Sequence, residues 1–107
     1  MTRKVSYHAQ VERKSRIEYI IDTFKGEFGS PMVEVVNEND CSRQVLTSNG
    51  IWIVYNLETN RLVTMWIATV EQGVKLYKRG TNGKQLPKQL MKTLHNNKKA
   101  CENQPKV

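Results

Sequence analysis

The sequence predicts an α+β fold, in which helices at both ends pack against an antiparallel meander sheet of four or five strands. Three observations lead to this prediction. A helical apolar pattern opens the chain, short extended segments separated by turn residues follow it, and a second helical pattern comes after a glycine-rich break near residue 80. A chain of 107 residues has the length of one domain, which we expect over residues 1–97.

Two helices are expected before the sheet. The longer covers residues 16–25, where four apolar residues recur at helical spacing: Ile17, Ile20, Ile21 and Phe24. Ser15 and Glu18 match a capping box at its start. Because Arg13 and Lys14 interrupt the apolar pattern, we expect residues 7–14 to form a separate, shorter helix.

The middle of the chain has the pattern of strands. We expect them over residues 32–36, 43–48, 51–55, 62–70 and 74–79. Asn49-Gly50 favours a type I′ hairpin turn between the second and third strands. The strand over residues 62–70 is apolar on both faces, which predicts a central position. The last strand alternates with basic residues, which predicts an edge position.

The C-terminal part is expected to form one helix and a tail. Leu86, Leu90 and Leu94 make an apolar stripe, and Pro87 suits the first turn of a helix. Residues 98–107 are polar and basic without a period, so we expect a flexible basic tail there.

Positive charge is concentrated in the last part of the chain. Residues 74–107 contain nine Lys or Arg residues and one acid, Glu102, a formal net charge of +8, whereas residues 31–73 carry −3. A segment of this kind attracts polyanions, and phosphate backbones are the commonest of these in a cell. RNA or DNA is therefore the expected partner, and an acidic protein is the alternative.

Several classes of protein and site are disfavoured. The longest apolar runs, residues 51–55 and 65–68, are too short to cross a bilayer, and the N-terminus lacks the apolar stretch of a signal peptide. Cys41 and Cys101 lie far apart, which is typical of two thiols in the cytoplasm rather than a disulfide. Without a CxxC pair, a phosphate-binding loop or a dinucleotide motif, we expect no metal and no cofactor.

Seven residues are candidates for nucleic-acid contact: Lys75, Tyr77, Lys78, Arg79, Lys84, Lys88 and Lys92. The cations would contact phosphates, and Tyr77, like Tyr55, lies near a strand end where its ring could stack on a base. Trp52 and Trp66 are expected in the core. The alternative for the lysines is a solvated helix face without a ligand.

His8 is a candidate for general acid or base catalysis, because an imidazole titrates near neutral pH. Arg13 and Arg16 could hold a phosphate by charge-assisted hydrogen bonds. In the alternative interpretation, His8 is a surface residue of a charged helix. His95 is expected at a helix end, where it interacts with the helix dipole.

Residues 6–17 resemble the start of small bacterial and phage domains of the RelE and colicin D ribonuclease superfamily. The pattern is Ser-x-His-Ala, an arginine a few residues later, and Arg-Ile at the start of a second helix. Residues 61–66, Arg-Leu-Val-Thr-Met-Trp, are similar to a strand of that family with a threonine in its middle. The resemblance covers residues 5–79 and implies a metal-independent RNase-like fold in which three residues match motif positions: His8, Arg13 and Thr64.

The sequence therefore predicts a small basic nucleic-acid-interacting protein, with two alternatives for its activity. One is a metal-independent endoribonuclease of the toxin type, from a phage or mobile element, with the catalytic residues His8, Arg13, Arg16 and Thr64. For such a toxin, the acidic partner would be an antitoxin. The other is a phage or host regulatory protein that binds nucleic acid or an acidic host protein without cleaving anything.

Overall fold

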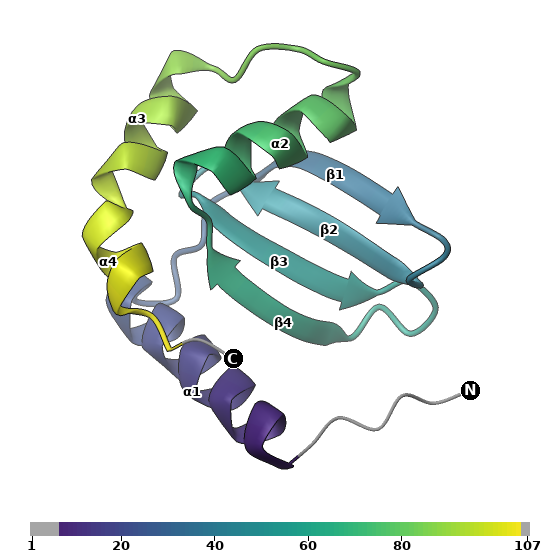
Figure 1. Ribbon diagram of the computed structural model, residues 1–107, viewed down its shortest axis with the longest axis vertical. Coiled ribbons are helices and arrows are strands. Elements are labelled where there is room, and N and C mark those ends of the chain that lie inside the picture. The colour runs from purple at the N-terminus through teal and green to yellow at the C-terminus, as the bar shows by residue number, and fades with distance from the viewer. Residues whose placement is uncertain (1–6, 106–107) are drawn as a thin grey trace.

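The computed structural model describes residues 7–105, with side chains from residue 13 onward. Eight elements follow one another along the chain: α1 (Tyr7–Phe24), β1 (Pro31–Asn37), β2 (Ser42–Thr47), β3 (Ile51–Asn56), β4 (Leu62–Ile67), α2 (Val70–Thr81), α3 (Lys88–Asn96) and α4 (Lys98–Asn103). The α+β class is confirmed, because a helix precedes the sheet and helices follow it (Figure 1).

The four strands form one antiparallel meander in the order β1-β2-β3-β4. The turn between β2 and β3 is not the predicted type I′ turn, because positive φ is required at both central residues and only Gly50 has it, at 83°. The Gly50 N–H donates to the Thr47 carbonyl at 3.0 Å, and β3 begins at the next residue. The hairpin position is confirmed and its turn type is corrected.

β4 occupies an edge of the sheet, whereas a central position was predicted. The strand ends at Ile67, and the predicted edge strand over residues 74–79 is part of helix α2. A capping box starts this helix: the Thr69 hydroxyl accepts from the Gln72 N–H at 3.1 Å, and Gln72 Oε1 accepts from the Thr69 N–H at 3.0 Å. The alternation of apolar and basic residues over positions 74–79 predicted a strand wrongly, because Val70, Leu76 and their neighbours also fit a helical period.

The N-terminal region is one helix rather than the two predicted. Ser15 is exposed in the interior of α1, so the predicted capping box at this position is wrong. Arg16 is fully buried one turn before Ile20, at a position that usually holds a hydrophobic residue when a helix packs on a sheet. The helix continues through the predicted break because the polar atoms of this arginine find partners on β4.

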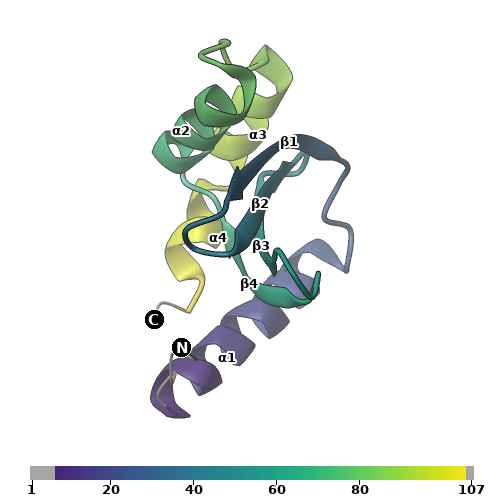
Figure 2. The ribbon, with the colours of Figure 1, turned by 90° about the vertical axis from the view of Figure 1, so that its right-hand side faces the viewer.

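Two apolar clusters hold the helices on opposite faces of the sheet. Beneath α1, Ile20 packs against Ile51, Ile53, Met65 and Ile67. On the other face, Leu76, Leu90 and Leu94 of α2 and α3 pack against Val33 and Leu46. Figure 2 shows α2 on one side of the sheet and α1 running beneath β4.

The segment predicted as a flexible tail contains helix α4 and packs onto β4. Cys101 and Gln104 are buried. Gln104 Oε1 accepts from the Ile67 N–H at 2.8 Å, and its Nε2 donates to the Ile67 carbonyl at 2.9 Å. The Gln104 side chain thus hydrogen-bonds to the end of the edge strand. The prediction of a flexible tail is therefore wrong for residues 98–104, which pack onto β4. Within residues 7–105, no helix combines the length and apolar character needed to span a membrane.

Candidate nucleic-acid interface

The sheet face that carries α2 is covered unevenly. Helix α2 packs mainly on β1 and β2, and in Figure 1 it lies across these strands while β3 and β4 remain in view. Gly80 allows this close approach, because a Cβ at this position would collide with Val33 Cγ2 and lie 3.0 Å from the Glu34 carbonyl oxygen. The β3–β4 half of the same face is thereby left without α2 above it.

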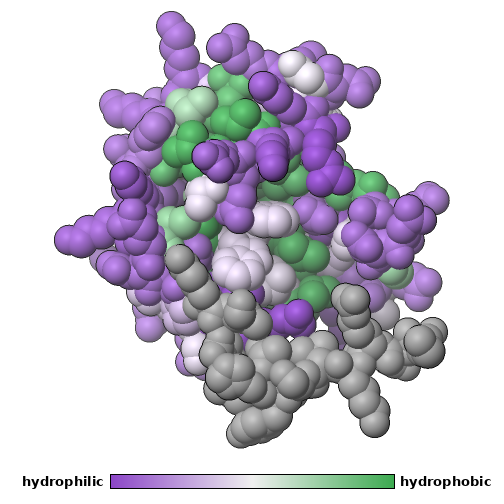
Figure 3. All heavy atoms as spheres, viewed as in Figure 1, coloured by the Kyte–Doolittle hydropathy of each residue, from purple (hydrophilic) through white to green (hydrophobic). Residues whose placement is uncertain are grey.

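Two tryptophans lie side by side on this half of the face. Trp52 pairs with Trp66 across β3 and β4, and Val54 pairs with Thr64 in the next row of the same face. We call these four residues the tryptophan face. Both indoles are half-buried, so the prediction that they belong to the core is only partly right. Figure 3 shows residues of apolar and intermediate hydropathy in the middle of this side of the molecule, with hydrophilic residues around them.

Arg16 reaches from α1 to the tryptophan face. Its Nε donates to the Met65 carbonyl at 2.9 Å, and its Nη2 donates to Thr64 Oγ1 at 2.6 Å. Its guanidinium carbon lies 3.3 Å from the centre of the Trp66 ring, a cation–π contact that strengthens away from water. The structure thus brings together two of the candidate catalytic residues, Arg16 and Thr64, which are 48 positions apart.

The burial of Arg16 defines what it does in this arrangement. The side chain has 0% exposure and Thr64 has 9%, so the guanidinium acts on the strand and on the Trp66 ring rather than on solvent. Since Trp66 is partly exposed, Arg16 holds the indole in place without covering it completely. Arg16 is therefore a positioning residue of the tryptophan face.

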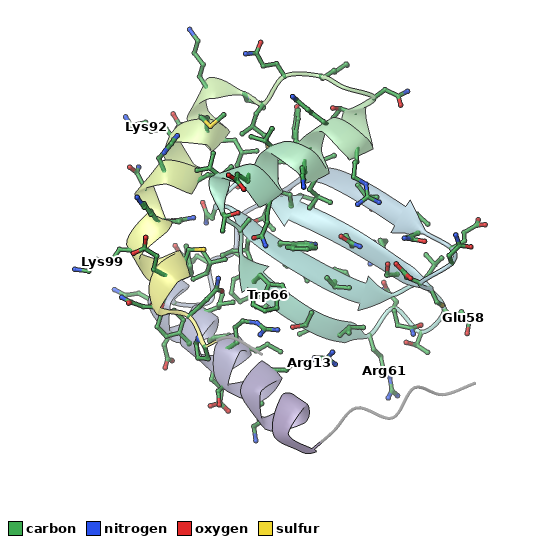
Figure 4. The ribbon with its side chains drawn as sticks, viewed as in Figure 1. Arg13, Glu58, Arg61, Trp66, Lys92 and Lys99 are labelled. Atoms are coloured by element: carbon green, nitrogen blue, oxygen red, sulfur yellow. The ribbon has the colours of Figure 1, made fainter. Side chains whose placement is uncertain are left out.

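The other two candidate catalytic residues lie elsewhere. Arg13 is half-exposed and lines a cleft of about 450 Å³ with Val63, whose side chain points to the opposite face of β4 from Thr64. Figure 4 shows Arg13 on α1 below the sheet. His8 lies in the first turn of α1, and its side chain is outside the described part of the chain.

The candidate nucleic-acid residues are distributed over two helices and the connection between them. Lys75, Lys78 and Arg79 are exposed on α2, and Tyr77 packs against the apolar cluster beneath that helix. Three further lysines are exposed on the connection and on α3: Lys84, Lys88 and Lys92. Tyr55, the other aromatic residue expected near solvent, is half-buried and lies 4.8 Å from the Arg43 guanidinium carbon.

A cleft of about 110 Å³ joins α2 to the tryptophan face. Six residues line it: Gln44, Trp52, Gln72, Lys75, Leu76 and Arg79. The Trp52 indole N–H donates to Gln44 Oε1 at 3.0 Å. Sequence reasoning missed Gln44 and Gln72, and it placed Lys75 and Arg79 on a strand. The signal that could have corrected this was the Thr69-x-x-Gln72 capping box, which starts a helix at residue 70 and puts residues 72, 75, 76 and 79 on one helix face.

Side chains that could ligate a metal ion do not cluster in the part of the chain that the structure describes. No three His, Cys, Asp or Glu side chains among these residues are grouped as a metal site requires. The polar groups of the interface are cations, amides and a hydroxyl, which suit anions and hydrogen-bond acceptors instead.

No protein-family model matches this chain, and no curated protein or solved structure matches it significantly. The resemblance to the RelE and colicin D superfamily therefore stays a prediction.

Proposed function

We propose that this protein binds single-stranded nucleic acid across the tryptophan face and the adjoining basic side of α2. The observation that carries the proposal is the position of Lys75 and Arg79, which line one cleft together with Trp52. Aromatic faces stack on unpaired bases and contribute roughly 1–3 kcal/mol per base, while neighbouring cations contact the phosphates. Both kinds of group lie here within one base-sized region.

A single strand fits this surface better than a duplex does. The aromatic residues lie on a sheet face rather than on a projecting helix that could enter a major groove. Bases in a duplex are already stacked on one another, so only an unpaired base can use an indole as a platform. The further lysines on α3, such as Lys88 and Lys92, would attract the strand over a longer range.

The test measures binding of labelled single-stranded RNA and DNA of about ten nucleotides by fluorescence anisotropy over a range of salt concentrations. Removing both cations of the cleft, in Lys75→Ala with Arg79→Ala, should weaken binding about tenfold and reduce the salt slope by about 1.4. The control removes the same charge from α4, in Lys98→Ala with Lys99→Ala, and should weaken binding by only about twofold. Figure 4 places Lys99 on the outer side of α4.

Equal losses in the two double variants would mean that the chain attracts nucleic acid by net charge alone, which contradicts the proposed interface. If neither RNA nor DNA is retained at low salt, the proposal is wrong, and an acidic protein becomes the partner to seek for the basic surface.

Metal-independent ribonuclease activity is the second candidate function. One observation favours it: Arg16, on the helix that carries His8, contacts Thr64, so two members of the predicted catalytic set from separate segments meet. Because the Arg16 guanidinium is buried, its role there would be to position Thr64 rather than to contact a phosphate. Labelled RNA would be incubated with the protein in EDTA, in parallel with His8→Ala. Cleavage that is lost in the variant would support the enzyme, whereas retarded but intact RNA would support binding alone.

A further inference from the structure

The cleft between α2 and the tryptophan face presents an unusual set of polar groups. Its polar lining consists of two amides, an indole and two cations: Gln44, Gln72, Trp52, Lys75 and Arg79. Lysine, arginine and indole side chains can only donate hydrogen bonds, whereas a glutamine amide has both a donor and an acceptor end. The direction of the two amides therefore decides what the cleft can recognise.

The Gln44 amide is oriented by its bond to Trp52. Because an indole N–H can only donate, the atom that receives it at 3.0 Å must be the amide oxygen, Oε1. This bond uses one of the two lone pairs of the oxygen and fixes the amide, so the NH₂ end is the part of Gln44 best placed to meet a ligand. Gln44 is half-buried on β2 directly beside β3, which restricts its movement.

The Gln72 amide is oriented in the same sense. Its oxygen accepts the Thr69 N–H at 3.0 Å as part of the capping box that starts α2. Both amide oxygens that line the cleft thus already accept a hydrogen bond, so the lining side chains offer mainly donors, two of them charged. A ligand that fits must be rich in hydrogen-bond acceptors and flat enough to stack on an indole. It must also carry a negative charge next to its flat part.

We propose that this cleft is a subsite for one nucleotide carrying a keto base, that is uracil, thymine or guanine, and that it disfavours adenine. The base lies against Trp52, its carbonyl oxygen accepts from the Gln44 NH₂, and an adjacent phosphate lies by Lys75 and Arg79. Glutamine normally recognises adenine with both ends of its amide, donating to N7 and accepting from the N6 amino group. In this cleft the indole N–H of Trp52 takes one lone pair of Gln44 Oε1 and fixes the direction of the amide, so both of its ends cannot turn to one adenine. The inference rests on the proposed function and specifies the base that the interface selects.

The experiment compares oligo(U) and oligo(dT) with oligo(A) and oligo(dA) of equal length at one salt concentration. We expect the keto oligomers to bind about threefold to tenfold more tightly in both sugar series. In Gln44→Met, which keeps the length of the side chain without its amide, the preference should fall to near one. Thermal unfolding of each variant confirms that it is folded.

Trp52→Phe provides a second, independent test. The phenyl ring keeps a stacking surface but has no N–H, so Gln44 Oε1 is released and both ends of the amide can meet adenine. We expect oligo(A) to bind more tightly to this variant than to the original protein, while oligo(U) does not gain.

The outcomes separate this inference from the proposed function. Equal affinity of the original protein for the keto and adenine oligomers overturns the inference and leaves single-strand binding intact. An unchanged preference in Gln44→Met also overturns it, since base selection would then arise elsewhere. Absence of binding to every oligomer overturns the proposed function, and the inference with it.

Discussion

Two halves of the same sheet face are stabilised in different ways. On β1 and β2, apolar packing dominates: Val33 and Leu46 lie beneath α2, and Gly80 lets the helix approach closely. On β4, polar side chains from the two ends of the chain bind the outer edge. Arg16 donates to the Met65 carbonyl, and Gln104 bonds both main-chain groups of Ile67.

The difference has a functional consequence. Exposed edge strands invite pairing with other chains, and side chains that occupy their main-chain groups prevent it. Arg16 and Gln104 hold β4 at its outer edge, where α2 does not pack, and both indoles of the tryptophan face remain partly exposed. The first half of the face therefore contributes to stability, and under the proposed function the second half would take part in recognition.

The largest expected effect comes from Arg16→Ala. This change removes two hydrogen bonds of a buried charged group and the contact with Trp66, and it should lower the free energy of unfolding by about 3 kcal/mol. Urea unfolding followed by circular dichroism measures the change. The control Arg13→Ala, at a half-exposed position on the same helix, should cost no more than about 0.5 kcal/mol. Similar losses in the two variants would contradict the role of Arg16 as an anchor of β4.

Gln104→Ala tests the other anchor. It leaves both main-chain groups of Ile67 without this side-chain partner, and we expect a loss of about 2 kcal/mol. Hydrogen exchange of the Ile67 amide should become faster, because its N–H loses its acceptor. The neighbouring exposed position provides the control, in Asn103→Ala. If Ile67 exchange does not change, the C-terminal segment does not hold the strand in solution.

Gly80→Ala tests the apolar half. The new Cβ would collide with Val33 Cγ2, so α2 must shift away from β1; part of this cost is offset because alanine favours a helix. We expect a net loss of about 1 kcal/mol in thermal unfolding. The control Lys78→Ala changes an exposed residue of the same helix. A stabilised Gly80→Ala variant would show that α2 does not pack this closely on β1.

The smallest effect is expected for Val54→Thr, on the tryptophan face. Val54 is half-buried with no α2 packed above it, so the added hydroxyl can remain hydrated and the loss should stay within about 0.5 kcal/mol. Val33→Thr makes the same change beneath α2 and should cost about 1 kcal/mol or more, because its hydroxyl is buried. Equal losses of unfolding free energy in the two variants, measured by urea unfolding, would contradict the distinction between the two halves of the sheet face.

Local signals predicted much of the fold and part of the site. The Asn49-Gly50 turn, the Leu90 and Leu94 stripe and the strand near residue 32 depend on neighbouring residues, and each lies where the sequence indicates. The stretch from residue 68 to 79 was assigned wrongly because a short apolar segment fits both a strand and a helix. The sequence indicated Arg16 and Thr64 as separate candidates. Nothing in their spacing revealed that the buried guanidinium of Arg16 contacts both Thr64 and Trp66.

By itself the sequence determined the α+β class, the position of the hairpin and the accumulation of positive charge after residue 74, since these depend on residues close together in the chain. The tertiary structure alone decided that β4 lies at an edge, that Trp52 meets Trp66, and that Gln44 presents its donor end. The physical reason is distance along the chain. Arg16 bonds a residue 48 positions away, and Gln104 one 37 positions away, and such contacts form only when the whole sheet and its helices are assembled.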